Sequence, residues 1–200
     1  MRLTGSLQGS RLSIVALFLV VICPRPLFSA GWRDLPRPRS ANPIIVRLIA
    51  TADRQSMTFH RLLEDIARTD GIVYIETGFC GHGVRSCVPH SMARSGSFRL
   101  LRILIDRHYT KSADAPLARV IAHELQHALE ILANPKITNG AAMVMFYNRE
   151  TPTGGAFETA EAIRIGDRVA GEMAAAGRDE LKLAERARED AVVAKAFGEQ

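Results

Sequence analysis

The segment VIAHELQHAL, residues 120–129, contains the pattern His-Glu-x-x-His with histidines at His123 and His127. Residues four positions apart lie on one side of an α-helix, with Cβ atoms about 5–6 Å apart. Both imidazoles can therefore reach one metal ion. Glu124 directly follows the first histidine, where it can accept a proton from water bound to that ion. The segment predicts a helix that carries a metal site and a general base.

Helical periodicity places Glu124 on the apolar side of this helix, which we expect to span residues 117–133. At 100° per residue, the two histidines lie at the border between the apolar stripe and solvent, whereas Glu124 falls inside the stripe. The stripe consists of Leu117, Val120, Ile121, Leu125, Ala128, Leu129, Ile131 and Leu132. Burying an unpaired carboxylate is costly, so an ordinary surface role explains Glu124 poorly. We expect it to be the catalytic residue.

The segment resembles the active-site helix of the zincin metallopeptidases. The residues around the two histidines fit the longer form of that motif, with β-branched Val120, uncharged Leu125, Gln126 and Ala128, and hydrophobic Leu129. Glu130 and Ala133 replace the glycine and histidine of the metzincin branch, which leaves a gluzincin-like arrangement. The resemblance implies an α+β, zincin-like fold with a small mixed sheet, an active-site helix and a C-terminal helical part. It also implies an edge strand, here residues 98–105, along which an extended substrate pairs.

A gluzincin-like site needs a glutamate from a later helix as its third metal ligand, and three glutamates compete for this role. Glu158 begins a row that continues with Ala162, Ile165, Val169 and Met173, so we expect it to point inward and to be the ligand. Glu161 lies toward the edge of that helix, where an ion pair with Arg164 explains it. Glu130 is better placed for a supporting contact, because ligands from one straight helix would be spread along its axis.

The resemblance implies zinc-dependent hydrolysis of peptide bonds, with Zn²⁺ held by His123, His127 and Glu158 and a peptide or protein as substrate. An oxyanion formed during cleavage needs a hydrogen-bond donor. Tyr147 is the candidate that we carry forward, and Tyr109, His108 and Arg149 are alternatives. The competing hypothesis is an exported zincin-like domain that binds a metal or a protein without turnover.

The charge distribution argues against a nucleic-acid partner. The chain of 200 residues has 26 Lys and Arg against 21 Asp and Glu, a net charge of +5. Residues 1–40 contain six arginines and one aspartate, which accounts for the whole excess, so residues 41–200 are balanced. A footprint for nucleic acid would instead require a basic surface on the folded domain.

The N-terminal residues have the pattern of a secretory signal. Arg2 and Arg11 precede an apolar run at residues 12–22, and small residues follow at positions 29–31. The run is too short to cross a membrane, although an uncleaved N-terminal anchor is the alternative. We therefore expect a signal peptide over 1–31, a linker over 32–43, the metallopeptidase domain over 44–177 and a charged helical tail over 178–200. The protein would then be secreted or periplasmic; the sequence predicts no oligomeric state.

Two cysteines, Cys80 and Cys87, lie outside the predicted signal in a glycine-rich stretch. An even pair in an exported chain favours a disulfide. The alternatives are free thiols and a zinc site formed with His82 and His90, although that spacing matches no standard finger or ribbon.

The remaining pattern predicts further helices and strands on either side of the motif. Ser56 is a favourable N-cap for a helix that ends at residue 68. We expect helices over 43–52, 56–68, 139–148 and 156–176, and strands over 72–76 and 98–105.

Overall fold

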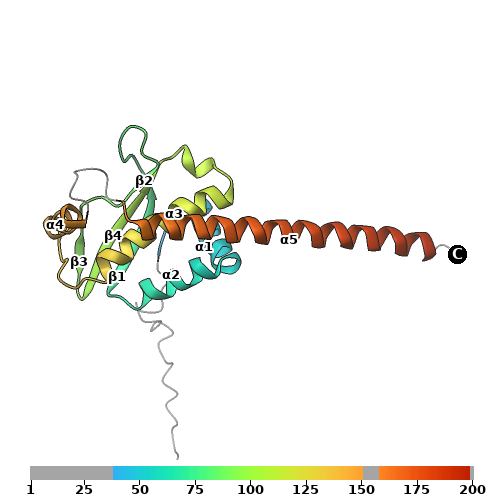
Figure 1. Cartoon of the computed structure of the whole chain (residues 1–200), viewed down its shortest axis with the longest axis horizontal. Helices are drawn as coiled ribbons and strands as arrows, with labels where there is room; N and C mark the ends of the chain where they lie inside the picture. Colours follow the sequence, from blue (N-terminus) through green and yellow to red (C-terminus); the bar gives the residue numbers. More distant parts are fainter. Residues whose placement is uncertain (1–37, 151–157, 199–200) are drawn as a thin grey trace, which may run out of the picture. The chain divides into compact units, whose positions relative to one another are not determined.

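Helices and short strands make up the computed structural model, which describes residues 38–150 and 158–198 (Figure 1). The elements are α1 (Pro43–Gln55), α2 (Met57–Ala67), β1 (Gly71–Thr77), β2 (Ser86–Cys87), β3 (Ala93–Ser95), β4 (Phe98–Ile105), a 3-10 turn (Tyr109–Lys111), α3 (Asp114–Leu132), α4 (Gly140–Glu150) and α5 (Ala160–Gly198). This mixture of helices with one small sheet confirms the α+β class. The predicted signal segment and residues 32–37 of the predicted linker lie outside the described residues.

The sheet is built around β4, which has partners on both sides. β1 pairs with it in parallel along its length, from Gly71 opposite Arg99 to Thr77 opposite Ile105. β2 and β3 pair antiparallel with the other side of β4, near its end and its start respectively. The prediction of an edge strand at residues 98–105 is therefore wrong. The apolar composition of the strand suits the interior of a sheet, and the chain between β1 and β4 folds back onto it in two short pieces.

The last residues of the predicted linker are hydrogen-bonded to β1. The amide of Arg39 donates to the carbonyl of Val73 at 2.8 Å, and the amide of Ile75 donates to the carbonyl of Arg39 at 2.7 Å. The Asn42 side chain then accepts from the amide of Ile44, which caps α1. Residues 38–42 thus lead directly from the sheet into the first helix.

The N-terminus of α2 is joined to α5 through one carboxylate. Ser56 caps α2 as predicted, because its hydroxyl oxygen accepts from the amide of Phe59 at 3.0 Å. The same hydroxyl donates to Glu172 of α5 at 2.6 Å, and Thr58 donates to Glu172 through both its amide and its hydroxyl. Burial raises the pKa of the Glu172 carboxyl, but these hydrogen bonds outweigh it and hold the pKa below its usual value.

The helix that carries the motif, α3, packs against the sheet and against α5 (Figure 1). Its apolar stripe is buried as predicted, with Leu117, Ile121 and Leu125 in the core. Gly166 allows α5 to approach closely, since a Cβ at that position would lie 2.9 Å from the carbonyl oxygen of Arg119 and 3.3 Å from Cβ of His123. Residues on α5 are therefore held next to the first histidine of the motif.

The C-terminal part of the chain is one continuous helix. We expected a helix over 156–176 followed by a charged helical tail over 178–200; in the structure the two are joined, because α5 runs without interruption from Ala160 to Gly198. Residues 178–191 are exposed, as the charge pattern predicts. Within the described part of the chain, no helix is both long and apolar enough to cross a membrane.

Candidate metal centre

The structure brings together the three residues that we expected to hold a metal. Nε2 of His123 lies 3.1 Å from Nε2 of His127 and 3.3 Å from Oε2 of Glu158. One potential ligand atom from each residue lies within 4.8 Å of the others. Two ligand atoms bound at about 2.0–2.1 Å to one tetrahedral ion are roughly 3.3–3.4 Å apart. The spacing of these side chains therefore fits a single small divalent ion.

Glu158 does not lie on the helix where we expected it, although it is grouped with the two histidines as expected. We placed it in the first turn of a helix, pointing into the core; the structure places it before α5, and its side chain is 50% exposed. Thr159 caps the helix instead, because its hydroxyl oxygen accepts from the amide of Ala162 at 3.1 Å. Glu161 pairs with Arg164 on the surface, as predicted, and is not part of the cluster.

Glu130 contacts His127 at the ring nitrogen that does not face His123. One carboxylate oxygen of Glu130 lies 3.2 Å from Nδ1 of His127, and the other accepts from Thr159 at 2.9 Å and from Gln126 at 3.2 Å. Burial raises the pKa of Glu130, but these hydrogen bonds lower it further than burial raises it. An ionised Glu130 accepts the Nδ1 hydrogen of His127 and so leaves the lone pair on Nε2, the atom that faces His123.

The imidazole of His123 is biased toward its neutral form. Burial is the largest effect, and the charges of His127 and Arg119 add to it, so that the pKa of His123 is lowered although the charge of Glu158 opposes the change. A neutral imidazole offers a lone pair to a metal, whereas a protonated one does not. His123 is thus suited to offer a lone pair to a cation near neutral pH.

Glu124 is buried next to the histidines, as its place on the apolar stripe predicts. It is 5% exposed, and the hydroxyl of Ser86 donates to its Oε1 at 2.6 Å. Burial, followed by the charge of Glu158, raises the pKa of Glu124, while the hydrogen bond from Ser86 and the charge of His127 oppose the shift. A raised pKa makes the carboxylate a stronger base than an exposed glutamate.

A cavity of about 400 Å³ connects Glu124 and the candidate ligands beside it to solvent. It is lined by Gly83, Val84, Arg85, Ser86, Arg119, Val120, His123, Glu124 and Glu158. The cavity therefore contains the candidate base and two of the three candidate ligands, which allows a substrate to approach them together.

Among the candidates for an oxyanion donor, Tyr147 is close enough to Glu124 and Glu130 for their charges to act on its hydroxyl. It is 4% exposed on α4, and its ring lies 4.7 Å from that of His90. Burial, with the charges of Glu124 and Glu130, raises the pKa of Tyr147, which keeps the hydroxyl protonated and able to donate. Tyr109 and His108 line a different cavity, beside Phe79 and His82, and Arg149 lines a third.

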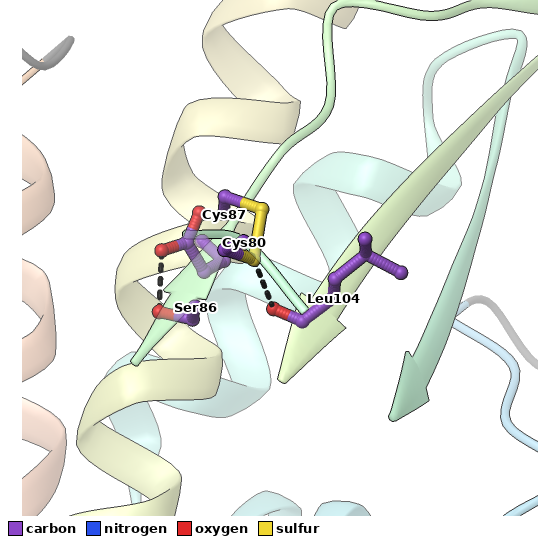
Figure 2. Close-up of a disulfide and its surroundings, with 5 residues drawn as sticks. Cys80, Ser86, Cys87 and Leu104 are labelled. Carbon is purple, nitrogen blue, oxygen red and sulfur yellow. Dashed lines mark hydrogen bonds between the residues drawn. A yellow bond between two sulfur atoms is a disulfide. The ribbon is translucent and has the colours of Figure 1, made fainter. Parts of the chain in front are cut away.

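The structure confirms a disulfide between Cys80 and Cys87, whose Cα atoms are 5.9 Å apart (Figure 2). The loop that it closes turns through Gly81 and Gly83, both with positive φ, which other residues rarely adopt. The alternative of a zinc site formed by Cys80, His82, Cys87 and His90 is therefore wrong, because both sulfurs are already bonded.

Sequence reasoning missed Ser86, which contacts Glu124 from a segment 38 residues earlier in the chain. Its neighbour Cys87 was singled out, but no pattern in the sequence joins this serine to the helix.

Comparisons with protein-family models, curated proteins and solved structures found no match to this chain. The assignment of the site therefore depends on the motif and on the geometry around it.

Proposed function

We propose that this protein is a zinc-dependent hydrolase that cleaves peptide bonds, with His123, His127 and Glu158 as metal ligands and Glu124 as general base. The observation that carries the proposal is the close approach of the three ligand atoms beside a buried glutamate. A zincin-like arrangement is part of the proposal. It is supported by a small mixed sheet packed on the helix with both histidines, and by a later segment that supplies the third carboxylate.

Two imidazoles and one carboxylate form a donor set that suits zinc and leaves a further position for water or substrate. When bound, zinc supplies Lewis acidity, which polarises a carbonyl group and lowers the pKa of water. The raised pKa of Glu124 suits this carboxylate to accept a proton from the attacking water and to deliver it to the leaving amine. Tyr147, protonated and near Glu124, is the candidate donor to the oxyanion.

The disulfide supports an oxidising compartment, secreted or periplasmic, because such bonds persist outside the cytosol. A peptide or protein substrate would enter through the cavity that contains Glu124 and His123. Pairing along residues 98–105 is not part of the proposal, since β4 already has strand partners on both sides.

Metal content and proteolysis test the proposal directly, and two neighbouring glutamates provide a matched pair. The native chain should contain one zinc per molecule and hydrolyse casein. Glu158→Ala should lose most of the zinc, because it removes a carboxylate 3.3 Å from His123. Glu161→Ala should keep it, since Glu161 pairs with Arg164 outside the cluster. Equal zinc in both variants would place the third ligand elsewhere, and zinc retention without hydrolysis would support the binding-domain alternative.

Glu130→Ala should weaken zinc binding about 10- to 100-fold without removing a ligand. The variant deprives Nδ1 of His127 of its acceptor and releases Thr159, the residue next to Glu158. Competition with a fluorescent zinc chelator measures the change in affinity, with Glu161→Ala as the control. An affinity equal to that of the native chain would show that Glu130 does not orient His127.

A further inference from the structure

A hydrogen bond between side chains connects the candidate base to the sheet. Oγ of Ser86 lies 2.6 Å from Oε1 of Glu124, and it belongs to β2, a strand of two residues. Glu124 is nearly fully buried, so the rotamer of its side chain depends on the few polar groups that reach it. Ser86 is thus positioned to determine where the other carboxylate oxygen lies.

The strand that carries Ser86 is itself held at two places. Ser86 pairs with Ile105 and Cys87 pairs with Leu104, and the amide of Asp106 donates to the carbonyl of Arg85 at 2.8 Å. So short a ladder is marginal by itself.

The disulfide supplies the second anchor (Figure 2). It joins Cys87 to Cys80, and the chain just before Cys80 is attached to the same strand β4, because the amide of Gly78 donates to the carbonyl of Ile105 at 2.9 Å. Sγ of Cys80 also lies 3.6 Å from the carbonyl oxygen of Leu104. Both ends of the disulfide are therefore held against one region of β4, directly beside Ser86.

We propose that Ser86 is a positioning residue for Glu124 and that the Cys80–Cys87 disulfide holds the strand that carries it. This inference rests on the proposed function, because it assigns a role in the reaction of the same site. The hydroxyl of Ser86 holds one carboxylate oxygen, which leaves the other to exchange the proton with water. The loop between the cysteines acts on catalysis through this contact.

Steady-state kinetics on the zinc-loaded chain test the role of the hydroxyl. Ser86→Ala should lower kcat about 10- to 100-fold, a loss typical of a misplaced catalytic group, while KM and zinc content stay unchanged. Ser86→Thr keeps a hydroxyl and should restore most of kcat. Ser95→Ala is the matched control, because Ser95 is an exposed serine on the other short strand paired with β4. A native kcat in Ser86→Ala would overturn the proposal.

Thermal unfolding of the metal-free chain tests the contact independently of activity. Ser86→Ala should lower the Tm by several degrees, and the same change should have little effect when Glu124→Ala is already present. Equal shifts in the two backgrounds would show that the contact does not exist. If this coupling is found but the native zinc-loaded chain hydrolyses nothing, the proposed function fails while the contact stands.

The disulfide is tested in the same way. Ser86→Ala should lower kcat much less in a chain that also has Cys80→Ala and Cys87→Ala than in the chain with the disulfide. An equal loss of kcat in the two chains would overturn the role of the disulfide. If this double variant does not fold, hydrogen exchange of the native chain replaces it. Exchange at residues 86–88 should accelerate after reduction by a phosphine, and unchanged exchange would give the same negative answer.

Discussion

Glu124→Gln should keep its zinc and lose about 10²- to 10⁴-fold in kcat, the range expected for removal of a general base. The amide has the size of the carboxylate and keeps an oxygen that can accept from Ser86. It cannot accept a proton from water, however, and the reaction loses its base. Zinc should remain because the three ligand atoms belong to His123, His127 and Glu158. Zinc analysis together with casein hydrolysis measures both parts of the prediction.

Glu161→Gln is the matched control for this variant, since it makes the same chemical change on a surface glutamate paired with Arg164. It should behave as the native chain does in both assays. Native activity in Glu124→Gln would exclude the proposed mechanism. Loss of zinc from Glu124→Gln would instead show that this glutamate belongs to the metal-binding group.

The motif helix was predictable because one periodic pattern carries both its burial and its chemistry. The spacing of His123 and His127 places their rings together, and the apolar stripe around Glu124 predicts its burial, which the structure confirms. The disulfide was also predictable, because two cysteines in a glycine-rich loop need no distant partner. Each of these predictions uses only residues close together in the sequence.

The parts that sequence reasoning missed involve residues far apart in the chain. Ser86 reaches Glu124 only because β2 pairs with β4, and two residues are too few for any strand pattern. The helical position expected for Glu158 was wrong because the row of apolar residues that it seemed to begin starts at Ala162, after a cap at Thr159. Periodicity does not say where a helix begins, which its capping hydrogen bonds decide.

Arg99 is an intermediate case, since a signal was present but was not used. Side chains alternate between the two faces of a strand, and Arg99 shares its face with Leu101, Ile103 and Ile105. All three of these are fully buried, and Arg99 itself is 3% exposed. The alternation therefore indicates a buried arginine, which requires partners for its charge and its donors.

The partners of Arg99 are at the C-terminus of the motif helix. Its guanidinium donates to the carbonyl oxygens of Ile131, Leu132, Asn134 and Ile137, at 2.5–3.3 Å. It also forms an ion pair with Asp70, just before β1. The last carbonyl groups of a helix have no partner within it and carry its negative dipole end. The buried guanidinium thus provides donors for carbonyl oxygens at and just after the end of α3, and it links that end of the helix to the sheet.

Arg99→Met should destabilise the fold by about 3–5 kcal/mol, the cost typical of breaking a buried charged network. The methionine fills part of the space but removes the charged donor that these carbonyl oxygens and Asp70 share. Arg99→Lys should not recover the loss, because an ammonium group lacks the planar fork that reaches the carbonyls and Asp70 together. Urea unfolding of the metal-free chain, monitored by circular dichroism, measures both changes without a contribution from zinc binding.

Arg102→Met provides the comparison, because Arg102 lies on the same strand but faces solvent and pairs with Glu76. An exposed pair contributes about 0–1 kcal/mol, so this variant should unfold almost as the native chain does. Similar losses for Arg99→Met and Arg102→Met would mean that the contacts at the end of α3 do not stabilise the fold. A selective loss at Arg99 would show that this arginine holds the helix carrying His123 and His127 against the sheet, and so maintains the geometry of the candidate metal site.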